Sequence, residues 1–358
     1  MKKGWIVKGT ESMKQITLMA VLAMVGAGVS VRAQAPPQLS PATAEAQQAT
    51  QAQQAAQAQV PTAHAATTDP FPPMNPKNFT IDEPTPAVVN EFLKTVWGYN
   101  DELSWRVEAI QKTSAPGVVR VVVFVANKAN PGKASRNEFF ITPDGKHAIA
   151  DAVLDFGAKP YADRRKTLQD QADGPAEGSA NKDFLIVEFV DLLNGQSKEV
   201  HDKVSNLQKD FPQARIVFES LPSDGNSYAL RAAAEGVCVR KAKGDAAFFI
   251  YADAVYNKEQ GLTAATLEPA LSAAVTAAGG DPKSIATCAD SQAAKDDVNA
   301  SIALGAAVGI DQSAVLVVNG RVLPAATMPY ETLKQIVAYQ AKLDGLIVHM
   351  QPTLSPLK

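Results

Sequence analysis

Residues 184–203 read FLIVEFVDLLNGQSKEVHDK, and this stretch decides how the second half of the chain should fold. Phe184 to Val190 are apolar except for Glu188, which predicts a buried strand. A helix rich in Lys, His and Val should follow, and Ala214 to Phe218 predict a second buried strand. Because strand, helix and strand in this order form a β-α-β unit, we expect an α/β domain here.

The rest of this half is predicted to add helices and a hairpin. Residues 228–308 are alanine-rich and should be helical. Residues 315–318 then predict a strand, Asn319-Gly320 a tight turn, and residues 321–323 the partner strand. A final helix is expected from about Tyr330.

A chain of 358 residues has room for a second domain, which we place at residues 77–168. Apolar residues recur at helical spacing between Pro86 and Gly98, so a helix should open this domain. Residues 118–125 are a dense β-branched run that predicts a strand, and residues 137–154 predict a further strand and hairpin. This order predicts a small α+β domain.

The first 76 residues carry signals of export rather than of a folded domain. Lys14 precedes an apolar run over residues 16–31, and Ala33-Gln34-Ala35 ends it, which is typical of a Sec-type signal peptide at residues 1–35. The run is shorter than the roughly 18 to 20 residues of a spanning helix, so an uncleaved anchor is the alternative. Residues 36–76 are rich in Ala, Gln and Pro and should form a disordered linker. We therefore expect a periplasmic or secreted protein.

Composition argues against several classes of partner. Lys and Arg number 34 against 37 Asp and Glu, without a basic stripe, so nucleic acid is not an expected partner. The histidines lie far apart and none stands at ligand spacing from a cysteine, so we expect no metal site and no cofactor. No membrane span is expected after signal cleavage. The four histidines are His64, His147, His201 and His349.

Several motifs of the second half resemble one known family. Residues 172–175 (ADGP), the strand that starts at Phe184, and residues 309–321 are similar to DsbA-like thioredoxin-fold disulfide oxidoreductases. This resemblance implies a thioredoxin-like fold with a DsbA-type helical insertion over residues 172–345, followed by a tail at residues 346–358. The first domain is similar to the N-terminal dimerisation domain of DsbC-like isomerases, which implies a homodimer; a folded spacer that lifts the second domain off its tether is the equal alternative.

The redox centre of that family is degenerate in this sequence. Asn194, Gly195, Gln196 and Ser197 stand in the four positions of its Cys-x-x-Cys motif, and Ala314 stands at the position of its cis-proline. Disulfide exchange needs a thiolate, which neither an amide nor a serine hydroxyl supplies. We expect a trans bond before Ala314, since a non-proline cis bond costs about 3 kcal/mol.

The residues in these positions have simpler expected roles. Asn194 or Ser197 should cap the helix that follows the first strand. His201 lies four residues after Ser197 on the same helix face and is the one candidate base of a Ser-His pair. A solvated or helix-capping histidine is the preferred interpretation.

The two cysteines of the sequence, Cys238 and Cys288, lie in the helical insertion. Some DsbA-like relatives hold this region together with a structural disulfide, so the resemblance implies a Cys238–Cys288 bond, which an exported protein can keep. Unpaired buried thiols and a displaced redox pair remain as alternatives.

The leading hypothesis is a pseudoenzyme, a non-redox polypeptide-binding, chaperone or adaptor protein of the cell envelope. Its partner would be an unfolded or extended polypeptide, or an envelope protein. The alternative is a thiol-disulfide oxidoreductase or isomerase acting through Cys238 and Cys288 or with a partner, so whether the protein is an enzyme stays open. The expected contact residues are Leu192, Leu193, Ser313 and Ala314.

Overall fold

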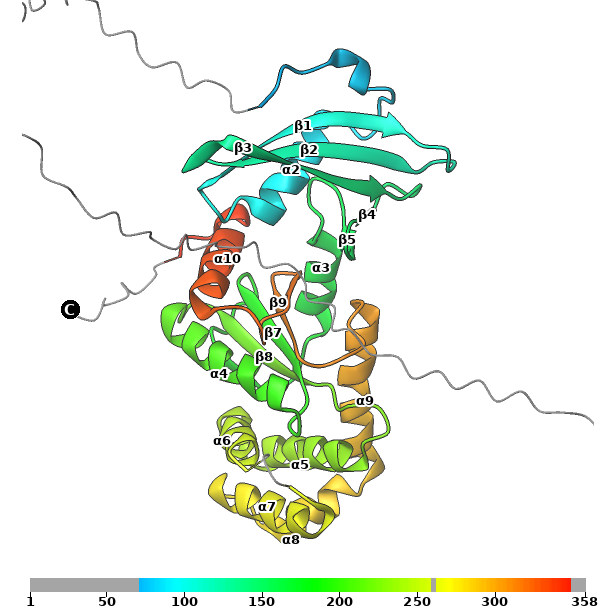
Figure 1. The fold of residues 1–358 in the computed structure, drawn as a ribbon. Helices are drawn as coiled ribbons and strands as arrows, with labels where there is room; N and C mark the ends of the chain where they lie inside the picture. Colours follow the sequence, from blue (N-terminus) through cyan, green and yellow to red (C-terminus); the bar gives the residue numbers. More distant parts are fainter. Residues whose placement is uncertain (1–70, 259–261, 349–358) are drawn as a thin grey trace, which may run out of the picture. The chain divides into compact units, whose positions relative to one another are not determined.

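The computed structural model describes residues 71–258 and 262–348, which contain two β-sheets with their helices (Figure 1). The predicted signal peptide and nearly all of the predicted linker lie outside these residues. Among the described helices, none combines the length and the apolar character needed to cross a bilayer. The described residues from Pro73 onward form one compact unit.

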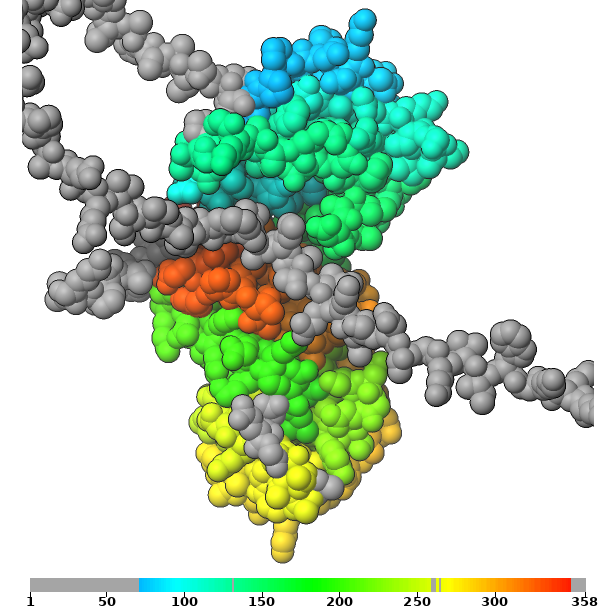
Figure 2. Space-filling view, viewed as in Figure 1, coloured from blue at the N-terminus to red at the C-terminus, as the bar shows by residue number. Residues whose placement is uncertain are grey.

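The first sheet is antiparallel and has the strand order β1-β2-β3-β4-β5. A short 3₁₀ helix, η2 (Pro76–Asn78), precedes helix α2 (Pro86–Trp97), and Phe92 and Leu93 of α2 pack against the sheet valines in one buried cluster. The five strands are β1 (Leu103–Lys112), β2 (Val119–Asn127), β3 (Asn130–Ile141), β4 (His147–Ile149) and β5 (Val153–Asp155). In Figure 2 these residues form the surface coloured blue to green.

The predicted helix and strands of this region are present. Thr85 caps α2 by accepting a hydrogen bond from the backbone N–H of Val88 at 3.3 Å, and Gly98 ends the helix. Strand β1 was not predicted. Its sequence does not alternate regularly, because a β-bulge shifts the register between Val107 and Ala109. The bulge hides the two-residue period by which a half-buried strand is recognised.

The second sheet has the strand order β10-β9-β7-β8-β6 and confirms the predicted β-α-β unit. The central strands β7 and β8 are parallel, and α4 connects them. Strand β9 is antiparallel to β7, and β6 is antiparallel to β8. The strands are β6 (Ala176–Gly178), β7 (Leu185–Val190), β8 (Arg215–Ser220), β9 (Val315–Val318) and β10 (Arg321–Leu323), and α4 is Gly195–Asp210.

Helices cover both faces of this sheet. On one face, Ile186 of β7 belongs to the same buried cluster as residues of α4 and of the last helix, α10 (Tyr330–Leu343). On the other face, Val187 clusters with Leu168 of α3 (Ala162–Gln171) and with residues of α9. Helix α3 was not predicted, because Leu168 is its one buried residue and its sequence shows no apolar stripe.

Five helices between β8 and β9 form the predicted insertion (Figure 1). They are α5 (Ser227–Lys243), α6 (Asp245–Tyr256), α7 (Ala264–Ala277), α8 (Pro282–Ala289) and α9 (Gln292–Ala307). The hairpin after β9 turns at Asn319 and Gly320, with φ angles of 46° and 88°. Both residues need positive φ in such a two-residue turn, which explains the Asn-Gly pair.

Candidate functional site

The candidate site lies where β7 ends and α4 begins. Asn194 is the N-cap of α4, and its side-chain oxygen accepts hydrogen bonds from the backbone N–H groups of Gln196 and Ser197 at 2.8 and 3.2 Å. Gly195 and Gln196 are exposed. The predicted capping role of Asn194 is therefore confirmed, and its side-chain oxygen stabilises the start of the helix.

Ser197 is fully buried and also has an internal partner. Its Oγ accepts a hydrogen bond from the backbone N–H of Asp191 at 3.0 Å. Asp191 is buried too; one carboxylate oxygen accepts from the Leu193 N–H at 2.8 Å, and the other accepts from the N–H and hydroxyl of Ser223 at 3.0 and 2.7 Å. The polar atoms of this turn thus hold the end of β7, the start of α4 and the loop before α5 together.

Two expectations about the neighbouring residues were wrong. Leu192 is 2% exposed and packs in the core, so its side chain offers no contact surface, whereas Leu193 is half-buried. The Ser313–Ala314 peptide bond is cis, not trans. The trans bond was predicted from the general preference of peptide bonds, which ignores tertiary packing. In the structure, Ala314 packs against the core immediately before β9. Ser313 and Ala314 are both half-buried.

His201 is neither solvated nor a helix cap, which corrects the preferred interpretation. Its side chain is 5% exposed, its Nδ1 lies 2.9 Å from Glu188 Oε1, and its Nε2 lies 3.3 Å from Asp253 Oδ1. Glu188 comes from the middle of β7 and is fully buried, while Asp253 of α6 is largely exposed. Because both ring nitrogens face carboxylates, neither one is left as a base for Ser197.

The charge of His201 follows from these partners. Burial favours the neutral imidazole and would lower the pKa of His201, but Glu188 and Asp253 outweigh burial and raise this pKa to about 10. The imidazolium therefore balances a carboxylate that would otherwise be an uncompensated charge in the core. Sequence reasoning considered His201 only with Ser197, although Glu188, the one charge in an apolar strand, signals that a cation must lie nearby.

The cysteines form the implied bond. Cys238 of α5 and Cys288 of α8 are joined in a disulfide with a Cα–Cα separation of 6.0 Å. Cys238 is 1% exposed. Since the sequence holds two cysteines, this bond leaves the chain without a free thiol. The site at the start of α4 therefore has no group that could begin thiol-disulfide exchange.

The order of the second sheet, with a helical insertion between its central parallel pair and its hairpin, defines a thioredoxin-like domain. The family model described as thioredoxin matches residues 172–338. This segment therefore has the thioredoxin-like fold that its motifs predicted. The match does not extend to the first sheet, so the similarity of that region to DsbC-like isomerases stays a prediction.

Three solved structures illustrate the likeness. A periplasmic thioredoxin-like protein from Salmonella enterica serovar Typhimurium is 17% identical, with a TM-score of 0.43 over 50% of this chain and 96% of that one. BdbD from Bacillus subtilis is 19% identical, with a TM-score of 0.42 over 47% and 93%. The thiol-disulfide exchange protein α-DsbA2 from Wolbachia pipientis is 19% identical, with a TM-score of 0.43 over 50% and 94%. The comparison with curated proteins gives no match.

Proposed function

We propose that this protein is a non-redox polypeptide-binding protein of the cell envelope, which acts as a chaperone or adaptor. The observation that carries this proposal is the absence of a thiol at the start of α4, where the family has its Cys-x-x-Cys motif. Asn194 Oδ1 and Ser197 Oγ accept hydrogen bonds from the local backbone, and the two cysteines are bound to each other in another part of the domain. Because the fold is present but this site has no thiol, we favour a binding role over thiol-disulfide exchange.

The proposed contact surface consists of half-buried and exposed apolar residues around the start of α4. Leu193 and Ala314 are half-buried and pack against the same core cluster. Tyr228, in the first turn of α5, is 46% exposed and follows the loop that Ser223 ties to Asp191. Such partly exposed apolar groups suit an unfolded or extended client. The predicted signal peptide supports a periplasmic or secreted location for this task.

The direct test is suppression of client aggregation. Reduced, unfolded lysozyme would be diluted into buffer with the full chain, and light scattering would be followed. We expect the wild type to lower the scattering, Tyr228→Glu to lower it less, and Val153→Glu, which changes a 65% exposed residue of the first sheet, to act as the wild type does. The proposal would be contradicted if the wild type did not suppress aggregation and also retained no envelope protein in a pull-down.

The family itself favours a second candidate, a thiol-disulfide oxidoreductase that uses Cys238 and Cys288. Its weakness is that Cys238 is buried, whereas an attacking thiolate must be accessible. The reduction potential of the bond separates the two candidates. A value below about −300 mV is that of a structural disulfide, and one between about −120 and −200 mV together with turnover of scrambled substrate would establish the enzyme.

A further inference from the structure

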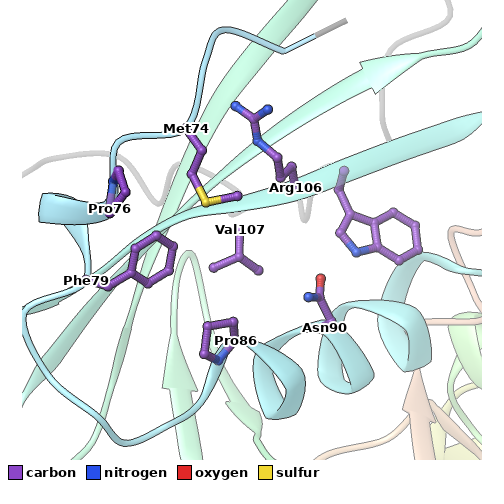
Figure 3. Close-up of a pocket in the computed structure, with 8 residues that line it drawn as sticks. Met74, Pro76, Phe79, Pro86, Asn90, Arg106 and Val107 are labelled. Carbon is purple, nitrogen blue, oxygen red and sulfur yellow. The ribbon is translucent and has the colours of Figure 1, made fainter. Parts of the chain in front are cut away.

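Two pockets among the described residues have linings that select no single class of ligand. One, of about 540 Å³, lies between β1 and α2, with Phe79, Pro86 and Val107 around it, and is mostly apolar (Figure 3). The other, of about 330 Å³, lies beside α5 and α9, and its lining includes Arg240 and Asp245, which pair with each other at 2.7 Å. A charged cluster in the helical insertion is chemically more specific.

In this cluster, three carboxylates share one guanidinium. The Nε of Arg231 on α5 lies 2.9 Å from Glu235 Oε1, one turn further along the helix, and 3.8 Å from Glu268 Oε1 of α7. The Nη1 of Arg231 donates to Asp290, the residue at which α8 ends. We call these four residues the Arg231 cluster. When all four groups are ionised, one positive charge faces three negative charges.

Glu235 differs from the other two carboxylates in its burial. Its side chain is 4% exposed, whereas the side chains of Glu268 and Asp290 are 60% and 73% exposed. Water therefore screens the charges of Glu268 and Asp290 but stabilises the charge of Glu235 little. Burial and the two neighbouring carboxylates outweigh Arg231 and raise the pKa of Glu235 from 4.5 to about 6. Glu235 is therefore the member of the cluster that takes up a proton in mildly acidic solution.

The other helices that pack against α5 place different groups around Glu235. Tyr251 of α6 is fully buried, its hydroxyl donates to the Ala232 carbonyl at 2.9 Å, and burial raises the pKa of Tyr251 well above its ordinary value. Helix α9 pairs with α5 through Asp297 and Lys241, nearly two helical turns beyond Glu235. Proton uptake near pH 6 in this part of the insertion is accordingly assigned to Glu235.

The Arg231 cluster and the disulfide connect overlapping sets of helices. Cys238 lies three residues after Glu235 on α5, and Cys288 lies two residues before the end of α8. The disulfide fixes α8 to α5 at any pH, whereas α7 is held by apolar contacts, such as those of Leu271 in the core cluster, and by Glu268. Ionised Glu235 competes with Glu268 for the guanidinium and repels it, so α7 is the helix whose attachment depends on the charge of Glu235.

We propose that Glu235 is a pH-sensitive contact that regulates how firmly α7 is held in the insertion. When Glu235 takes a proton from the solvent, the Arg231 guanidinium is left to Glu268 and Asp290, and α7 packs more firmly against α5. When Glu235 returns the proton, α7 loosens and the apolar side chains beneath it, including Leu271, are exposed more often. The contact uses none of the residues at the start of α4, so it goes beyond the proposed function.

The test is hydrogen exchange of the full chain at pH 5 and pH 7.5, with each rate corrected for the intrinsic effect of pH. The closed state binds the proton of Glu235 more tightly than the open state does, so closure is strongest below about pH 4.5 and weakens as the pH rises through about 6. We expect the opening equilibrium constant of α7 to be about eightfold larger at pH 7.5 than at pH 5. Helix α4 is the internal reference and should not show this change.

Matched variants assign the effect to Glu235. Glu235→Gln should remove the pH dependence of α7, whereas Glu199→Gln, at an exposed position of α4, should retain it in full. Glu268→Gln should reduce the dependence, because the repulsion between α7 and Glu235 is lost, and it supplies an independent result if Glu235→Gln does not fold. The proposal would be overturned if α7 of the wild type opened equally at both pH values, or if α4 and α7 lost protection together.

Discussion

At the scale of single residues, the turn between β7 and α4 is held by its own polar side chains. The Oδ1 of Asn194 caps α4, and the Oγ of Ser197 accepts a hydrogen bond from the backbone N–H of Asp191. Below them, His201 and Glu188 form a buried ion pair. Removing one partner of such a pair leaves an uncompensated charge, so these residues should matter more for stability than for chemistry.

His201→Gln should destabilise the protein by about 3 kcal/mol, because Glu188 loses its cation in the core. The matched variant Asp253→Asn removes a negative charge on a side chain that is 63% exposed and should cost about 1 kcal/mol or less. Urea unfolding of both variants measures the difference. Equal losses for the two variants would show that Glu188 does not depend on the imidazolium.

The same ion pair predicts a pH dependence. The folded state raises the pKa of His201 from 6.5 to about 10, so the stabilisation is complete below about pH 6.5 and is lost as the pH rises through about 10. The unfolding free energy of the wild type minus that of His201→Gln should therefore be largest at about pH 6 and smallest at about pH 10.5. A difference that grows with pH would contradict a protonated His201.

Asn194→Ala should cost about 1 kcal/mol of unfolding free energy, because two backbone N–H groups of α4 lose their acceptor. Asn194→Ser is the control, since serine also caps helices, and it should retain most of the stability. The comparison also tests the site: if Asn194 served a substrate and not the helix, both variants would lose client binding while keeping the wild-type stability.

At the scale of elements, the sequence predicted those with a clear period and missed those without one. The apolar run of β7 and the helical spacing before Gly98 were sufficient for prediction. Strand β1 was missed because of its bulge, and α3 because Leu168 is its single buried residue. Tertiary contacts stabilise both β1 and α3, so neither element needs a regular apolar period in its own sequence.

The Cys238–Cys288 disulfide links helix α5 covalently to helix α8. It closes a loop with a sequence separation of 50, so the double variant Cys238→Ala, Cys288→Ala should lose about 3 to 4 kcal/mol in the chain-entropy account. The neighbouring exposed substitution Thr287→Ala serves as the control and should have little effect. Unchanged stability of the double variant would mean that helix packing alone holds the insertion together.

At the scale of the whole molecule, Arg321 links the two sheets. It is 6% exposed and donates to the last carbonyls of α2, to Thr95 O at 3.1 Å and to Val96 O at 3.0 Å. The rings of Tyr99 and Tyr161 lie 5.8 and 6.0 Å from its guanidinium carbon. A charged group from β10 thus caps a helix that packs on the other sheet.

Arg321→Met should therefore lower the stability by about 2 to 3 kcal/mol, because charge-assisted hydrogen bonds to buried carbonyls are lost. Arg136→Met, at a position 48% exposed, should cost less than about 1 kcal/mol. Hydrogen exchange gives the sharper readout: α2 should lose more protection than β7. Uniform loss over both sheets would indicate that they unfold as one unit regardless of Arg321.

The β-α-β unit, the helical insertion, the Asn-Gly hairpin and the absence of a Cys-x-x-Cys motif could all be predicted from the sequence, because periodicity, turn residues and cysteine positions are local features. The side-chain contacts and the burial of single residues depend on the tertiary structure. His201 meets Glu188 and Asp253 only when β7, α4 and α6 pack together, and Leu192 is buried only because the core closes over it. Burial and charge pairing depend on residues far apart in the chain, so no local pattern could reveal them.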